Sequence, residues 1–289
     1  VLSFLSKPLF SNEILFDIQG NDFTDTQVIL SILNEIPNTS NEESTNDIIR
    51  VLNNSDLFSD VQVKLLENKY LIIVKEYPNI DKLYFKNNDR LKDDDLRLIA
   101  SQINFTKSNK SSINLFIKEL KNAYQSFGYN NVQIDYSEKQ YPKTNTVDLN
   151  FDINEGKITK INKIIINSNN FILDEDIRTI IKSKTKTITN IFANNNFKPN
   201  VVEKDKYLII NYFKEFGYID VKVETKIEYL KTDKVNIYFY IEEGDEYSFS
   251  SINIDDKKGI LDIETSNKVT EKLNLFLNDE EIYSIKKVN

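Results

Sequence analysis

The chain has 289 residues and a formal net charge of -8, with 40% apolar and 28% charged residues. This acidic balance argues against a general nucleic-acid binder, which needs clustered Lys and Arg to neutralise phosphates. Cysteine and histidine are both absent, so thiolate zinc sites are excluded, and the commonest general base and transition-metal ligand are missing. We therefore expect a non-enzymatic protein with no metal, no cofactor and no nucleic-acid partner.

Residues 1–12 are apolar and small, and we expect them to be a leader or the remnant of a signal peptide. The first repeating unit is predicted over 13–78. It starts with a strand that ends at Gly20-Asn21, continues with two amphipathic helices, and closes with two strands ending at Glu76-Tyr77-Pro78. Ser40, with Glu43 three residues later, is the expected cap of the second helix.

The second unit is predicted over 79–157, in the same order of strand, two helices and two strands. Its second helix has the clearest pattern in the chain, with Ser111 or Ser112 as the expected cap and Gly128 as the stop. The third unit, 158–247, repeats this order. A fourth, over 248–289, shows one strand and one helix but no closing hairpin, so we expect it to be incomplete.

Two signals recur together in the second and third units and indicate an internal repeat. An alternating apolar strand is closed by Glu-Gly, and a Gly-Tyr step precedes that strand. The two copies are 147–153 with Glu155-Gly156 after Gly128-Tyr129, and 235–241 with Glu243-Gly244 after Gly217-Tyr218. Each unit is therefore predicted to be α+β, with a three-stranded sheet covered on one face by two helices.

These motifs resemble the POTRA domains of BamA-type outer-membrane assembly proteins. The family's pattern is a Gly-Asn turn after the first strand, a Gly-Tyr step before the second, and a Glu-Gly or Glu-x-Pro close after the third; the segment 57–61, Leu-Phe-Ser-Asp-Val, is also similar to a family motif. Asn87 and Ser168 stand where the turn glycine is usual, and Asp56 replaces the first glycine of the Gly-Tyr step. The resemblance implies tandem POTRA modules, each β-α-α-β-β with a mixed three-stranded sheet.

The resemblance further implies a scaffold and chaperone-like receptor at the periplasmic face of the bacterial outer membrane. Its expected partners are unfolded outer-membrane β-barrel proteins, periplasmic assembly lipoproteins and, if the chain is a fragment, its own C-terminal membrane barrel. Two alternatives stay open. One is the POTRA region of a related translocation factor of the TamA type, and the other is a purely structural spacer that docks partners without touching clients.

Acidic clusters are the only candidates for side-chain chemistry. Asp93-Asp94-Asp95 could hold a cation, but acidic residues at a helix start also complement the helix dipole, and we favour that role. The segment Asn253 to Glu264 resembles a calcium loop but has Lys257 and Lys258 at positions that such a loop cannot give to lysine. Glu242-Glu243-Gly244-Asp245 is explained as well by a strand end as by a carboxylate pair.

The remaining candidate for function is the backbone of an edge strand, which can pair with an extended partner whatever its side chains. By the family resemblance the second strand of each unit is the free edge. In the third unit this is the predicted strand from Ile219 to Tyr229. We expect client or partner strands to bind there, and a merely solvated edge is the alternative. The residues expected nearest the contact are Ile219, Val221, Val223, Thr225 and Ile227.

Overall fold

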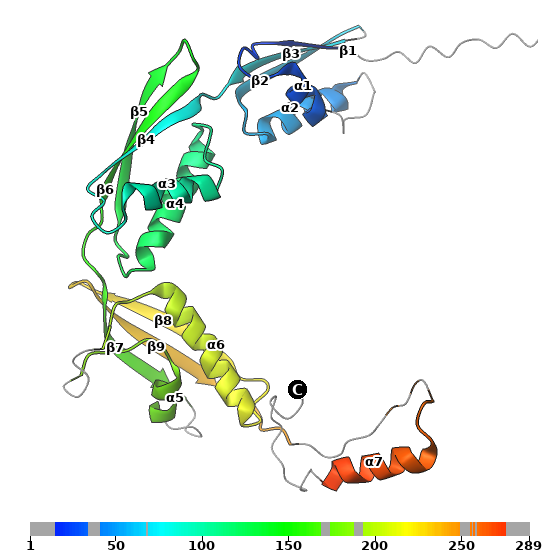
Figure 1. The fold of residues 1–289 in the computed structure, drawn as a ribbon, viewed down its shortest axis with the longest axis vertical. Coiled ribbons are helices and arrows are strands. Elements are labelled where there is room, and N and C mark those ends of the chain that lie inside the picture. The colour runs from blue at the N-terminus through cyan, green and yellow to red at the C-terminus, as the bar shows by residue number, and fades with distance from the viewer. Residues whose placement is uncertain are drawn as a thin grey trace, which may run out of the picture. The chain divides into compact units, whose positions relative to one another are not determined.

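The computed structural model in Figure 1 describes residues 15–33, 41–67, 69–168, 174–187, 193–248, 255, 257 and 259–275. The expected leader and the expected first strand of the fourth unit lie outside these residues. Within the described part of the chain, no helix is long and apolar enough to cross a lipid bilayer.

Three sheets share one topology. In each, the last strand in sequence lies in the centre, parallel to the first strand and antiparallel to the second. The strands are β1 (Leu15–Gln19), β2 (Phe58–Leu66) and β3 (Lys69–Glu76); β4 (Asn79–Lys86), β5 (Gln133–Tyr141) and β6 (Thr146–Asn154); and β7 (Lys160–Asn167), β8 (Lys222–Leu230) and β9 (Lys234–Glu242). This confirms the predicted mixed sheets.

A pair of helices accompanies each sheet and lies against one of its faces (Figure 1). We call the three sheets with their helices the first, second and third modules. The pairs are α1 (Thr26–Leu33) with α2 (Glu42–Asn54), α3 (Asp93–Gln102) with α4 (Lys110–Gln125), and α5 (Asp174–Ile180) with α6 (Pro199–Glu215). The α+β class and the order β-α-α-β-β are thus confirmed.

Each module has its own core between the helices and one sheet face. In the third module, Ile177 of α5 and Ile209 and Phe213 of α6 are fully buried against the inward residues of β9. The second module uses phenylalanines instead. Phe116 of α4 lies 4.6 Å from Phe105 and 5.2 Å from Phe151 of β6, measured between ring centroids. Burying such side chains is the main source of each module's stability.

Two helix caps differ from the sequence prediction. The Asn41 side chain accepts a hydrogen bond from the Ser44 amide at 2.7 Å and caps α2, whereas Ser40 lies outside the described residues. Asn109, rather than Ser111 or Ser112, caps α4 by accepting from the Ser112 amide at 2.7 Å. Asparagine caps a helix as well as serine does, and here it stands where the helix begins.

The turns after the first strands need a left-handed backbone. Gly20 has φ +84°, and a Cβ built there would lie 2.1 Å from the Val74 carbonyl oxygen, so only glycine fits. At the same place in the second module, Asn87 adopts φ 61° and donates from its side chain to Asp152 at 2.7 Å. Asparagine tolerates this conformation best among non-glycine residues.

The α7 helix (Ile263–Leu275) lies in the predicted fourth unit and has no buried residues among those described. Asp262 caps it, with its carboxylate accepting from the Thr265 amide at 2.7 Å and from the Thr265 hydroxyl at 2.9 Å. These bonds, the amide first, lower the pKa of the Asp262 carboxyl. Asp262 belongs to the stretch that resembled a calcium loop, and its carboxylate is used as a helix cap.

Candidate functional site

The edge strand β8 has a single neighbour, β9, in the described sheet. Nine consecutive residue pairs, from Lys222 opposite Glu242 to Leu230 opposite Lys234, join the two strands without a bulge. The outer side of β8 therefore presents a regular row of backbone groups with no strand partner among the described residues. Such a row is a template for one more strand.

The five residues expected at this edge do not all lie in β8. The strand begins at Lys222, so Ile219 and Val221 stand in the approach to it, where the Ile219 amide donates to the Gly217 carbonyl at 3.0 Å. Val223, Thr225 and Ile227 lie in the strand. The apolar alternation of the sequence runs on through the turn after Gly217, which made the predicted strand start three residues early.

Three side chains of the predicted set face the helices. Val221 and Val223 are buried in the third module's core, and Ile227 packs against it. A partner strand at this edge would meet the backbone of these residues rather than their side chains. The side chains it could meet are the alternate, exposed ones, which the sequence reasoning missed: Lys222, Glu224, Lys226 and Glu228.

The uncovered face of the third sheet is ordered by side-chain contacts. Glu228 of β8 accepts from the Asn236 side-chain amide at 2.7 Å and from the Tyr238 hydroxyl at 2.8 Å. The bond from Asn236, followed by that from Tyr238, lowers the pKa of Glu228, and the same contact raises the pKa of Tyr238. Tyr238 also stacks on Tyr240, with ring centroids 6.3 Å apart. The two bonds to Glu228 tie β8 to β9 beside the free edge.

The β5 strand is the equivalent edge of the second module. It pairs with β6 through nine uninterrupted positions, from Gln133 to Tyr141, and most of its residues are exposed. On the uncovered face, the Tyr141 hydroxyl donates to the buried Asp148 of β6 at 2.9 Å. Lys139 lies 5.2 Å from the centre of the Tyr141 ring, and its contact with Tyr141 raises the Lys139 pKa. Both modules thus offer a long, regular edge.

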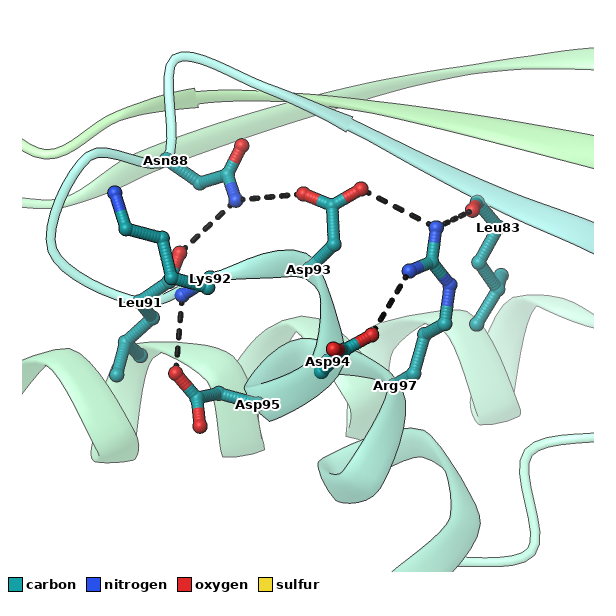
Figure 2. Close-up of polar contacts among 8 residues, drawn as sticks. All are labelled: Leu83, Asn88, Leu91, Lys92, Asp93, Asp94, Asp95 and Arg97. Carbon is teal, nitrogen blue, oxygen red and sulfur yellow. Dashed lines mark hydrogen bonds and ion pairs between the residues drawn. The ribbon is translucent and has the colours of Figure 1, made fainter.

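The opposite edges, β4 and β7, are irregular. The pairing of β4 with β6 shifts between Ile80 and Lys82, and that of β7 with β9 shifts between Ile161 and Lys163. In these two modules an arginine from the first helix also reaches the edge. Arg97 donates to the Leu83 carbonyl at 3.3 Å (Figure 2), and Arg178 donates to the Ile164 carbonyl at 2.9 Å.

The acidic triad of α3 is engaged in protein contacts, as Figure 2 shows. Asp95 accepts from the Lys92 amide at 3.0 Å, which is a cap of the helix start. Asp93 accepts from Asn88 at 3.0 Å and pairs with Arg97 at 3.2 Å, and Asp94 lies 3.5 Å from Arg97. Among the residues described, no group of acidic side chains is arranged to hold a metal ion.

The glutamates that close the third strands have a structural role. Glu76 accepts from the Phe23 amide at 3.0 Å and Glu155 from the Arg90 amide at 2.7 Å. Each carboxylate thereby holds the loop that follows the first strand of its module. Glu243, at the same place in the third module, is also buried. Glu242 is exposed whereas Glu243 is buried, which favours the strand-end interpretation of Glu242 to Asp245 over a carboxylate pair.

The Gly-Tyr steps hold the chain that leads out of each module. The Gly128 carbonyl accepts from the Thr159 amide at 2.9 Å, and the Gly217 carbonyl accepts from the Tyr247 amide at 3.0 Å. Asn130 adds two bonds from its side chain, to the Gly128 carbonyl at 2.9 Å and to the Phe197 carbonyl at 3.0 Å. The repeated motif therefore forms a joint between successive segments.

Comparison with known proteins agrees with this architecture. The POTRA family model, described as a surface antigen variable number repeat, matches residues 78–156 and 159–244, which together are more than half of the chain. The chain therefore belongs to the POTRA family, whose domains in BamA are scaffolds and not enzymes. This confirms the resemblance inferred from the motifs.

The relatives are outer-membrane assembly factors. The chain is 25% identical over 268 residues to the outer membrane protein assembly factor BamA of Neorickettsia risticii, covering 91% of this chain and 36% of that protein. It is 24% identical over 246 residues to BamA of Neisseria meningitidis serogroup B, covering 82% and 31%. The chain thus spans about a third of the length of these relatives.

A similar solved structure is that of the Haemophilus influenzae BamA POTRA3-5 segment. It aligns with a TM-score of 0.41 and 13% identity, covering 79% of this chain and 94% of that one.

Proposed function

We propose that this chain is a periplasmic scaffold in outer-membrane protein assembly, which receives unfolded β-barrel strands by strand addition at β8. The observation that carries the proposal is the regular nine-residue edge of β8, whose only strand neighbour in the described sheet is β9. Family membership and the relatives named as outer-membrane assembly factors support the setting.

The chemistry of the edge suits a client that is defined by its strand character. Backbone N–H and C=O groups recognise any extended chain, so one edge can serve many barrel sequences. The exposed residues beside it alternate in charge, with Lys222, Glu224, Lys226 and Glu228 on one face. We infer that they tolerate varied client side chains, and that the assembly lipoproteins are bound at surfaces other than this edge.

A pair of proline variants tests the proposal. Successive amides of a strand point to opposite sides, so of Glu224→Pro and Thr225→Pro, one removes a donor from the β9 ladder and the other removes one from the free edge. The variant that loses only a free-edge donor keeps its bonds to β9, so it is recognised as the one with the wild-type unfolding temperature. We expect it to lose affinity for a twelve-residue peptide of alternating Tyr, Val and Thr by about tenfold, because a donor is lost and the proline ring obstructs pairing.

The readout is photocrosslinking of that peptide to a benzoylphenylalanine at position 226. Glu224→Ala and Thr225→Ala are the matched controls, since they change the same side chains and keep the amides. If the folded proline variant captured the peptide as well as wild type does, strand addition at β8 would be excluded. A chain that bound lipoproteins but captured no peptide at all would instead be the structural spacer.

A further inference from the structure

The second and third modules begin their first helices with the same five-residue pattern of three acidic residues, an aliphatic residue and arginine. The two copies are Asp93-Asp94-Asp95-Leu96-Arg97 and Asp174-Glu175-Asp176-Ile177-Arg178. Leu96 and Ile177 are fully buried and fix the rotation of each helix. The arginine that follows is thereby aimed at the same part of the neighbouring sheet in both modules.

Each arginine occupies a backbone acceptor at the middle of an edge strand. Arg97 donates to the Leu83 carbonyl and Arg178 to the Ile164 carbonyl. The two carbonyls are equivalent, because Leu83 stands opposite Leu149 of β6 and Ile164 stands opposite Ile237 of β9. In the described sheets β4 and β7 each have one strand neighbour, and the loop between the helices bridges their first residues, Asn79 with Lys107 and Lys160 with Asn196. The carbonyls that the arginines bind lie beyond these bridges, in the part of the edge where a strand could be added.

The guanidinium of Arg97 is held in place from several sides, as Figure 2 shows in part. Asp93 binds it at 3.2 Å and Asp94 lies 3.5 Å away, while Asn88 holds the other oxygen of Asp93 at 3.0 Å. The guanidinium carbon also lies 5.8 Å from the centre of the Phe85 ring. An arginine fixed in this way costs little entropy to keep over the strand edge.

A second irregularity accompanies the arginine. Both β4 and β7 carry a register shift near their start, whereas β5 and β8 pair without interruption. Bulges and charged side chains are two of the devices that natural sheets use to blunt an edge. In both modules they stand together on the edge opposite to the long regular one.

We propose that Arg97 and Arg178 are edge latches, which prevent strands from adding to β4 and β7 and so direct an incoming strand to β5 and β8. That an incoming strand is directed to β5 and β8 rests on the proposed function, but the blocking of β4 and β7 does not. The first module lacks the latch, because Leu30 follows the buried Ile29 where the arginine would stand. No side chain in the described part of that module donates to the Phe16 carbonyl, the equivalent acceptor.

The test compares crosslinking of the Tyr-Val-Thr peptide at the two edges of the third module. Wild type should capture the peptide with benzoylphenylalanine at position 226 of β8 and not at position 163 of β7. Arg178→Met should raise capture at position 163 by about tenfold, since one charged hydrogen bond no longer has to be displaced. Arg178→Lys keeps the charge without the planar fork and should give an intermediate yield.

Arg50→Met is the matched control, because Arg50 is an exposed arginine of α2 that pairs with Asp47 and reaches no strand edge. Circular dichroism confirms that each variant is folded. A second readout needs no client: Arg97→Met with Arg178→Met should tighten self-association in sedimentation velocity by about tenfold, through pairing of exposed edges. A tenfold rise in either readout supports the latch.

The latch is refuted if both readouts stay at the wild-type level in folded variants, or if Arg50→Met changes them equally. The two proposals fail in different ways. Loss of wild-type capture at position 226 would overturn strand addition at β8, and sedimentation of the double variant would still decide the latch.

Discussion

The second and third modules share a backbone frame but fill the same helix position differently. Phe116 of α4 and Asp205 of α6 each stand twelve residues before the glycine that ends its helix segment, and both are fully buried. Phe116 stacks on Phe105 of the preceding loop at 4.6 Å. Asp205 instead accepts the Lys182 amide at 2.5 Å and the Ser183 amide at 2.9 Å.

The backbone hydrogen bonds at the start of the first strand recur in both modules. In the second and third modules, the first strand starts with an amide bond to the later hairpin turn and another to the loop between the helices. The pairs are Asn79 to Asn145 and Ile80 to Thr106 at 2.9 Å, and Lys160 to Asp233 at 2.9 Å and Ile161 to Asn195 at 2.7 Å. What the repeat preserves is therefore backbone connection, and one loop can be held by either apolar or carboxylate contacts.

Replacing the aromatic contact should have the largest effect. Phe116→Ala removes a fully buried ring from the phenylalanine cluster and should lower the stability of the second module by about 3–5 kcal/mol. Amide exchange measured by mass spectrometry on peptides from β4 to β6 reports this locally. Leu115→Ala, at an exposed neighbouring position, is the control. A loss below about 1 kcal/mol would mean that the loop is held mainly by other contacts.

Replacing the carboxylate should cost somewhat less. Asp205→Ala leaves two amides of the 182–183 turn without their acceptor, which should destabilise the third module by about 3 kcal/mol. Asp205→Asn keeps one acceptor oxygen and should lose about half as much. Amide exchange of the turn is the measurement, and Glu203→Ala on the exposed side of α6 is the control. Unchanged protection at 182–183 would refute this role.

The smallest expected effect is a shift in the Glu228 pKa on the uncovered face of the third sheet. Because contacts lower the pKa of Glu228, its contribution to stability is present above the ordinary value of 4.5 and is lost as the pH falls through the lower folded value. Asn236→Ala and Tyr238→Phe should therefore raise the Glu228 pKa seen by NMR titration and move that loss to higher pH. Tyr240 has no hydrogen bond to Glu228 among the described bonds, so Tyr240→Phe should leave the Glu228 pKa unchanged.

The module order was predictable because the apolar periods switch cleanly between strand and helix, as in Val147 to Ile153 and the face of α4. The start of β8 was not, since Ile219 and Val221 continue the apolar alternation while the backbone still turns. The cap of α4 was misplaced because Asn109 and two serines compete within four residues. In each case the pattern defined which side chains are buried and left the backbone path open.

The latch arginines were missed although their signal is present in the sequence. The acidic triad at 93–95 was interpreted as a helix start, which it is, and the arginine after it was not considered. Its repetition at Arg178 was visible. What sequence could not supply is the partner, because a backbone carbonyl such as that of Leu83 has no residue signature.

The bond from the Thr159 amide to the Gly128 carbonyl limits how the repeating unit can be duplicated. The copied segment, read from the motifs, ends after Glu155-Gly156, but the end of its helix is completed by residues of the next copy. The segment that is copied and the residues that close its helix end are thus offset, so each copy needs the residues just after its Glu-Gly close, Thr159 and Tyr247 here, to bind the glycine carbonyl.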